Sequence, residues 1–154
     1  MPKKWYIQIF PRGTTKRTKN DFDIIEARTL EKSTIGINFK DTVLTLTDNI
    51  LDCVSFDERA VLTKKQKEYR ERQFKYFVNE MQIGDTVYLK KGMHILYQAT
   101  ISSNYIYDDS DYNIDDNSDN IANGWFWRHR RTISNITPMN EFDRSVMYRT
   151  IYKK

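Results

Sequence analysis

Two runs of β-forming residues on either side of Lys91-Gly92 constrain the fold of this chain more than any other feature. Both runs are rich in β-branched and aromatic residues, and together they cover residues 85–101. A short turn that contains glycine between two such runs is typical of a β-hairpin. We therefore predict an antiparallel pair here. On its second strand, alternate residues are expected to share one face: Ile95, Tyr97, Ala99 and Ile101.

The segment before this hairpin predicts a helix over residues 64–81. Its apolar residues recur at i, i+3, i+4 and i+7 and form one stripe: Phe74, Phe77, Val78 and Met81. Thr63 is a suitable N-cap, because its hydroxyl can accept a hydrogen bond from the first turn. The lysines and arginines of this segment fall outside the stripe and are expected to face solvent. Gly84 is expected to follow the end of the helix and turn the chain.

The remaining periodic segments are short. Residues 5–10, 33–39 and 131–136 each predict a strand, and residues 42–47 predict either a strand or the lead into a helix. Residues 23–28 fit a short helix or a connector, and residues 139–152 fit a terminal helix. These elements predict an α+β fold, in which a mainly antiparallel, strongly curved sheet forms a small barrel with a few flanking helices.

The length of 154 residues predicts a single domain over residues 1–154. No apolar run approaches the roughly 20 residues that a membrane-spanning helix needs, and the apolar stretch near the N-terminus is too short for a signal peptide. One cysteine, Cys53, cannot form an internal disulfide, which fits a reducing compartment. We therefore expect an intracellular protein, cytoplasmic or nuclear, with no membrane partner.

The net charge of +4 conceals a segregation of charge along the chain. Residues 3–19 carry six basic residues and no acid, and residues 64–75 carry six basic residues against two glutamates. Residues 108–119 hold six aspartates and no base. The Asp/Asn-rich stretch 108–123 is therefore expected to be a solvated loop insertion. The rest of the chain is basic enough for a polyanionic partner, although basic surfaces also serve solubility.

No catalytic or metal-binding motif is present. The chain lacks a nucleophile elbow, a phosphate-binding P-loop and a dinucleotide fingerprint, and it has two histidines and one cysteine, too few for a familiar zinc site. Residues 109–120 begin like an EF-hand loop, but Ile114 stands where glycine is required and Asn120 where glutamate is required. We expect no enzyme activity and no cofactor.

Aromatic and basic residues form the remaining candidate for function, most densely in the stretch GWFWRHRR over residues 124–131. Nucleic-acid bases stack on aromatic side chains for roughly 1–3 kcal/mol each, and neighbouring Arg or Lys can contact phosphate. Any single Trp or Tyr in a strand is usually a core residue. As a set, the aromatic residues favour a base pocket.

The order of the motifs resembles the PUA-like group of EVE, YTH and McrB N-terminal-type domains. That group has a "GD-x-V" strand, a "G-x-V-x-x-x-Y" strand and a late "H-x-R-x-V" strand around a small barrel. The matching residues here are Gly84-Asp85-Thr86-Val87, Ala99 to Tyr105, and His129 to Ile133, after strands near Trp5 and Gly36. Two departures stand out. In the family the second strand often carries a Trp after its glycine, and here Asn38-Phe39 stand in that place. The family also has a glycine before the "V-x-x-x-Y" segment, and here Gln98 or Ala99 replaces it.

This resemblance implies a non-enzymatic module that binds DNA or RNA and holds a modified, methylated base in an aromatic cage after the base has flipped out. The base-pocket candidates are Trp5, Asn38, Phe39, Tyr105, Tyr107, Trp125 and Trp127. The phosphate-binding candidates are Arg128, Arg130 and Arg131, together with Lys64 and Lys65. Arg131 has an alternative role in pairing within the sheet, and Trp125 and Trp127 fall beside the matched motif rather than in it.

Two other interpretations remain open at the level of sequence. The first is a protein–protein interaction module of the viral or mobile-element effector type, which the acidic loop suits because it would repel nucleic acid. The second is a small metal-dependent nuclease with carboxylates such as Asp41, Asp85 and Asp108, although nothing in their spacing supports it.

Overall fold

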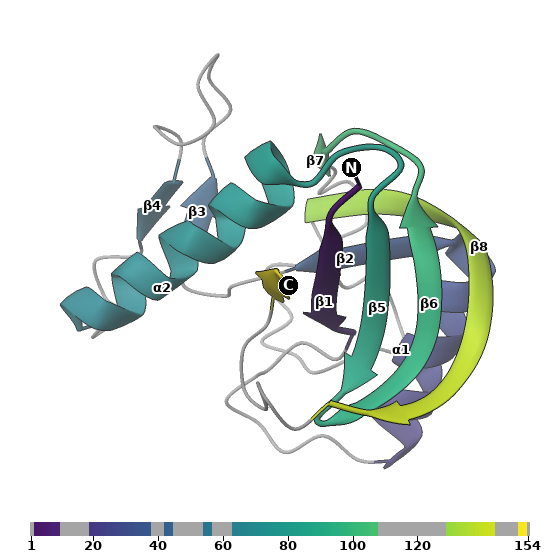
Figure 1. Ribbon diagram of the computed structural model, residues 1–154. Coiled ribbons are helices and arrows are strands. Elements are labelled where there is room, and N and C mark those ends of the chain that lie inside the picture. Colours follow the sequence, from purple (N-terminus) through teal and green to yellow (C-terminus); the bar gives the residue numbers. More distant parts are fainter. Residues whose placement is uncertain are drawn as a thin grey trace.

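The main sheet of the protein curls into a half-barrel in the computed structural model (Figure 1). The structure describes residues 2–9, 19–37, 42–44, 54–56, 63–107, 129–143 and 151–153. The strands are β1 (Lys4–Gln8), β2 (Thr34–Ile37), β3 (Thr42–Leu44), β4 (Val54–Phe56), β5 (Thr86–Lys91), β6 (His94–Ile101), β7 (Ile106–Tyr107), β8 (His129–Phe142) and β9 (Ile151–Lys153). The helices are α1 (Lys19–Lys32) and α2 (Lys64–Phe74), which continues as the π-helical segment η2 (Lys75–Glu80). The fold is thus mixed α+β, as predicted.

The strands of the large sheet follow the order β2-β8-β6-β5-β1-β9, and β7 pairs with the start of β8. All neighbours are antiparallel except β1 and β5, which are parallel. The first residues of β8 pair with β2 and the later ones pair with β6, so β8 carries the sheet around the curve (Figure 1). Register shifts interrupt the β5–β6 and β6–β8 ladders. Such bulges bend a strand and increase its twist, which explains the curl.

The predicted hairpin is confirmed, because β5 and β6 pair from Thr86↔Thr100 to Lys91↔His94. Gly92 has a φ of +61° in the turn, a conformation that glycine adopts at no steric cost. The predicted helix is also confirmed in α2 and η2. Thr63 caps it in a capping box: the Thr63 hydroxyl accepts from the Gln66 backbone N–H, and the Gln66 side chain accepts from the Thr63 backbone N–H.

The expected terminal helix over residues 139–152 is wrong where the structure describes this segment. Residues 139–142 belong to β8 and residues 151–152 belong to β9. The reason is tertiary: Phe142 pairs with His94 in the hairpin, and a ladder with distant residues overrides weak helical periodicity. The helix expected at residues 23–28 is longer, because α1 continues to Lys32 and buries Ile25 and Thr29 one turn apart.

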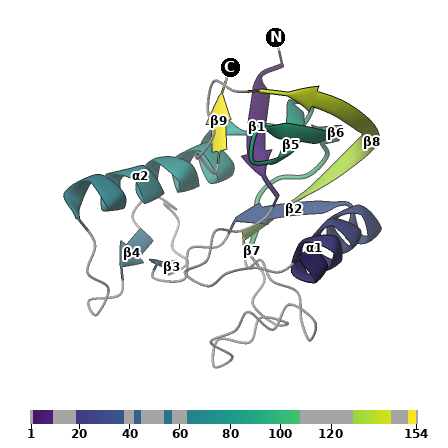
Figure 2. The same cartoon turned by 90° about the horizontal axis from the view of Figure 1, so that it is seen from below.

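The core fills the concave side of the half-barrel. Alternate residues of β1, β5 and β6 point into it, and the C-terminal part of the α2–η2 helix contributes its apolar stripe. Fully buried apolar side chains of these elements include Trp5, Phe74, Phe77, Leu89 and Ile101. Helix α1 packs beside β2 and adds Ile25 to the same core (Figure 2). Among the described residues, no helix is long and apolar enough to cross a membrane.

A buried carboxylate, that of Asp85, joins three segments at one end of the half-barrel. Its Oδ2 accepts from the Trp5 indole N–H at 2.9 Å and from the Gln82 backbone N–H at 3.0 Å, and its Oδ1 accepts from the Lys3 backbone N–H at 3.1 Å. The Asp85 residue is only 4% exposed. Three N–H donors replace the water that this carboxylate loses on burial, so it holds β1 and the end of η2 at the start of β5.

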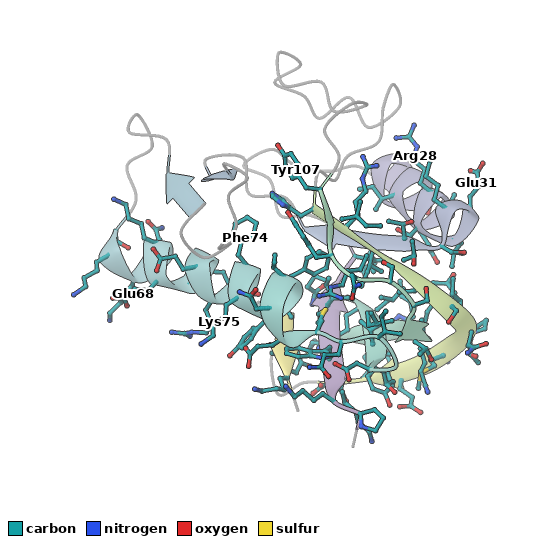
Figure 3. All side chains as sticks on the ribbon, turned by 90° about the horizontal axis from the view of Figure 1, so that it is seen from above. Arg28, Glu31, Glu68, Phe74, Lys75 and Tyr107 are labelled. Atoms are coloured by element: carbon teal, nitrogen blue, oxygen red, sulfur yellow. The ribbon has the colours of Figure 1, made fainter. Side chains whose placement is uncertain are left out.

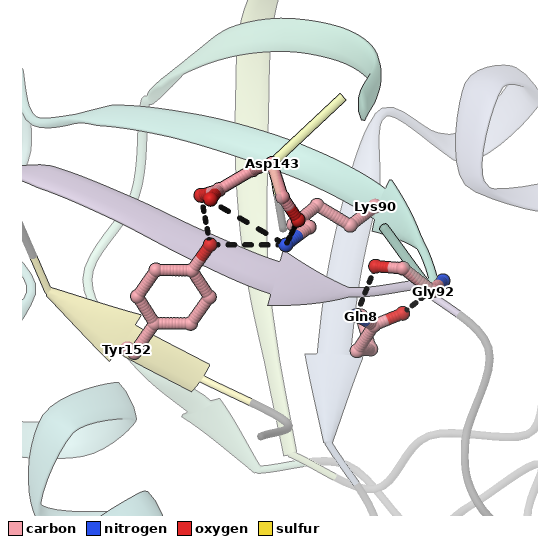
Figure 4. Close-up of polar contacts among 5 residues, drawn as sticks. All are labelled: Gln8, Lys90, Gly92, Asp143 and Tyr152. Carbon is pink, nitrogen blue, oxygen red and sulfur yellow. Dashed lines mark hydrogen bonds and ion pairs between the residues drawn. The ribbon is translucent and has the colours of Figure 1, made fainter. Parts of the chain in front are cut away.

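A buried ammonium, that of Lys90, closes the opposite end (Figure 4). It donates to the Asp143 backbone carbonyl at 3.3 Å and to the Tyr152 hydroxyl at 3.0 Å, and it lies 3.9 Å from the Asp143 carboxylate. Tyr152 in turn donates to that carboxylate. Beside this group, the Gln8 side chain pairs with both the N–H and the carbonyl of Gly92. The ends of β1, β5, β8 and β9 are therefore tied together through charge and hydrogen bonds.

A third polar contact fastens α1 to strand β6. The Tyr97 hydroxyl on β6 donates to a Glu26 carboxylate oxygen on α1 at 2.6 Å. Burial, followed by this hydrogen bond and the negative charge of Glu26, raises the pKa of Tyr97 to about 12. Tyr97 therefore stays neutral and keeps the contact throughout the physiological range.

We expect Asp85→Ala to lower the free energy of unfolding by about 3 kcal/mol, because it leaves three buried N–H donors without their acceptor. Urea denaturation followed by circular dichroism measures the change. Asp23→Ala, the same substitution at an exposed position of α1, is the control and is expected to have little effect. Equal losses in the two variants would show that the Asp85 contacts do not hold the fold.

We expect Lys90→Met to lower the free energy of unfolding by about 3–5 kcal/mol, because methionine keeps the length of the side chain but leaves the buried Asp143 carboxylate without its cation. Lys91→Met removes the same charge from the neighbouring exposed position and serves as the control in the same urea titration. A Lys90→Met protein as stable as the control would contradict the proposed role of the ion pair.

Candidate functional site

A surface pocket of about 570 Å³ lies where the end of η2 meets the loop between β6 and β7. Tyr105 and Arg131, two residues of the predicted site, line it. The other polar lining residues are the uncharged amides Asn79, Gln82 and Asn104. The apolar lining residues are Val78, Met81 and Ile83. The lining contains no acidic side chain.

Arg131 forms the inner wall of this pocket and is itself buried. Its Nε donates to the Phe77 carbonyl at 2.7 Å, Nη2 donates to the Val78 carbonyl at 3.1 Å, and Nη1 donates to the Ser103 carbonyl at 3.0 Å. The first two carbonyls belong to the last turn of η2, where a cation complements the helix dipole. Burial lowers the pKa of Arg131, and the charge of Asp85 opposes that shift. In place of the expected phosphate contact, Arg131 therefore joins the helix end to the β6–β7 loop.

The π-helical form of η2 creates this arrangement. The Met81 backbone N–H donates to the Tyr76 carbonyl at 2.9 Å, five residues back, and the Gln82 N–H turns to Asp85. The carbonyls of Phe77 and Val78 are then available to the Arg131 guanidinium. π-helical turns of this kind are rare and occur often at functional sites.

Tyr105 is held in place by aromatic neighbours. Its hydroxyl is 2.8 Å from Nδ1 of the buried His129, and its ring meets the Phe77 ring at 90° with 6.4 Å between the centroids. The His129 ring packs edge-on against Phe74 at 4.8 Å. We call Phe74, Phe77, Tyr105 and His129 the aromatic cluster. It fixes the orientation of a half-buried tyrosine that lines the pocket.

Tyr107 and Arg130 lie next to the aromatic cluster. The Tyr107 ring is 5.4 Å from the His129 ring, and Tyr107 is the last residue of β7 (Figure 3). Arg130 pairs with Gly36 on one side and Ile106 on the other, and it is half-buried, whereas its neighbours His129 and Arg131 point into the protein. Both residues are therefore close to Tyr105 along the sheet, but neither lines the pocket.

The other predicted site residues do not lie in the pocket. Trp5 is fully buried, and its indole N–H is bonded to Asp85, so the ring has a core role in place of the expected role in a base pocket. Lys64 and Lys65 are exposed at the start of α2. The remaining predicted residues lie outside the described part of the chain: Asn38, Phe39, Trp125, Trp127 and Arg128. Their segments join the described chain at Ile37 and His129, which are partners in the β2–β8 ladder.

Sequence reasoning missed the three amides of the pocket. Asn79 is exposed and lies outside the apolar stripe, Gln82 follows the helix, and Asn104 is in the loop before Tyr105. One sequence feature could have indicated them: uncharged polar residues, among them Gln82 and Asn104, occur just before and just after the β-hairpin. Which turns come together depends on the curl of the sheet.

The described residues contain no group of three His, Cys, Asp or Glu side chains that could hold a metal ion. Of the three carboxylates considered for a nuclease, Asp41 and Asp108 lie outside the described residues. The third, Asp85, accepts three hydrogen bonds from protein N–H groups. Its contacts are those of a structural residue.

We expect Arg131→Lys to lower the free energy of unfolding by about 2 kcal/mol, because a single ammonium cannot reach all three carbonyls that the guanidinium now joins. Arg130→Lys, at the outward-facing neighbouring position, is the matched control. Urea denaturation of both variants tests this. A loss that is equal in the two variants would indicate that the three contacts of Arg131 contribute little.

Comparison with known proteins identifies the family. No curated protein matches the sequence. The family described as "Domain of unknown function (DUF8426)" matches residues 15–153, a span that includes both helices and every strand except β1. With most of its length matched, the chain belongs to the DUF8426 family.

Proposed function

We propose that this domain binds nucleic acid and holds one base, flipped out of its stack, in the pocket beside Tyr105. The observation that carries the proposal is a tyrosine ring, fixed by its neighbours, on the wall of a pocket whose remaining polar side chains are mostly neutral amides. The volume of about 570 Å³ falls within the range of small-molecule sites in proteins.

The chemistry of the lining suits a base. Tyr105 offers a flat π-face, and stacking on such a face contributes roughly 1–3 kcal/mol. Because His129 and Phe77 already hold the ring, little conformational entropy is lost when a base stacks on it. Asn79, Gln82 and Asn104 each carry a group that donates and a group that accepts, as the edges of bases do.

We further propose that the half-barrel is of the PUA-like type and that the base is methylated. The order of the sequence motifs supports the first part, and the curl of the sheet is compatible with it. For the second part, Val78, Met81 and Ile83 give the pocket an apolar side against which a methyl group can pack. Tyr107 and Arg130, beside the aromatic cluster, would contact the flanking nucleotides.

The test is binding of fluorescent single-stranded DNA and RNA oligonucleotides, with and without one methylated base, measured by anisotropy. We expect Tyr105→Ala to weaken binding of the methylated oligonucleotide by about 5- to 150-fold, the equivalent of one lost stacking contact. Tyr105→Phe keeps the ring and is expected to retain most of the affinity. Circular dichroism confirms that each variant is folded.

Tyr88→Ala is the matched control, since Tyr88 is a half-buried tyrosine that stacks on Tyr6 and does not line the pocket. Its affinity for the oligonucleotide should equal that of the unmodified protein. The base-pocket proposal would be refuted if the affinity were the same with and without the methyl group and were unchanged in Tyr105→Ala.

One observation favours a second candidate, a protein-binding function. Phe142 is 66% exposed, and Met93 is 36% exposed, beside the hairpin turn at the end of the half-barrel that Lys90 closes. Phe142 stacks on His94 with 4.9 Å between ring centroids, so the imidazole covers one face of the exposed phenyl ring and helps to fix its orientation. A stoichiometric protein partner that survives nuclease treatment and is lost in Phe142→Ser would support this alternative.

A further inference from the structure

The first half of α2 presents charged side chains to solvent on nearly every side. Residues 63–68, 71 and 72 are exposed, and Tyr69 is half-buried. Residues 64–75 contain six basic and two acidic residues, a net charge of +4. The apolar stripe that anchors the helix begins only at Phe74. The helix therefore projects from the half-barrel as a basic arm, and Figures 1 and 2 show it extending away from the sheet.

The charges at the start of this arm oppose helix stability. Lys64 and Lys65 stand in the first turn, which has no acidic residue, and the positive end of the helix dipole disfavours cations there. The capping box of Thr63 and Gln66 compensates in part. Lys64 and Lys65 thus lower the stability of the helix, and both are exposed, so they gain no packing in return. Residues that are unfavourable in this way are expected where a surface serves binding.

The arm leads to the pocket. Lys75 and Asn79 are four residues apart and both exposed, so they lie close together on one side of the helix. Asn79 lines the pocket. At about 1.5 Å per residue, Lys75 is roughly 6 Å and Lys64 roughly 22 Å along the axis from Asn79. Figure 3 shows Lys75 and Phe74 projecting from opposite sides of the helix, and of the two only Phe74 is buried.

The pocket needs such a surface if it holds a base of a nucleic-acid strand. Arg131 is the cation in its lining, and that guanidinium is bonded to three backbone carbonyls. The phosphates next to a bound base must therefore find their counter-charges outside the pocket. The side of the helix that ends at Asn79 carries Lys75 and, one turn earlier, Arg72.

From these observations we infer that the exposed side of α2, with Arg72 and Lys75 nearest the pocket, binds the phosphate backbone of the single strand whose base enters the pocket. The inference rests on the proposed function and adds the path of the strand.

The double variant Arg72→Gln/Lys75→Gln tests the inference. Anisotropy titrations with a single-stranded oligonucleotide at several salt concentrations give the slope of log K against log salt. That slope is about −0.7 for each phosphate contact of a single strand. We expect the double variant to reduce its magnitude by about 1.4, corresponding to two lost contacts. Lys32→Gln/Lys91→Gln removes the same charge from exposed positions on α1 and in the hairpin, and should leave the slope unchanged.

An oligonucleotide with one abasic site separates this inference from the proposed base pocket. With it, Tyr105→Ala should have no further effect, whereas Arg72→Gln/Lys75→Gln should still reduce the slope. Equal slopes in the α2 variant and its control would overturn the inference and leave the base pocket standing. If the unmodified protein binds no oligonucleotide, both proposals are wrong.

Discussion

The buried carboxylate of Asp85 is the constraint on which the rest of the structure depends. It accepts N–H groups from Lys3, Trp5 and Gln82, which belong to the first strand and to the end of the long helix. Gly84, immediately before it, has a φ of +94° and lets the chain turn from the helix into β5. The three donors can move little relative to the Asp85 carboxylate. Each hydrogen bond that is lost would leave a buried, charged oxygen without a partner and would destabilise the fold. The parallel contact of β1 with β5 therefore starts at this point.

The candidate pocket follows from the same junction. Because the Gln82 N–H turns to Asp85, the last helical carbonyls are free to accept from Arg131, which also bonds the Ser103 carbonyl in the β6–β7 loop. These contacts bring the helix end and the loop to opposite sides of a shared hollow that Tyr105 lines. Arg131, a phosphate-binding candidate in the sequence, thus forms one wall of the pocket, while neutral amides supply most of its polar surface.

Local patterns predicted the parts of the fold that depend on local interactions. The hairpin around Gly92 and the helix capped by Thr63 agree with expectation, because turn geometry, capping and the apolar stripe act over a few residues. The expectation failed at residues 139–142, which pair with β6 across more than forty positions of sequence. A weak helical period cannot compete with a ladder whose partner strand is already fixed by its own hairpin.

The sequence by itself determined an α+β domain with a curved antiparallel sheet, a basic helix ending in an apolar stripe, and Tyr105 as a site candidate. Only the tertiary structure decided what the individual polar and aromatic residues do. Trp5 meets Asp85 across 80 positions, and Arg131 meets Phe77 across 54. Burial and hydrogen-bond partners of this kind arise when the sheet curls, and the spacing of residues along one chain does not encode them.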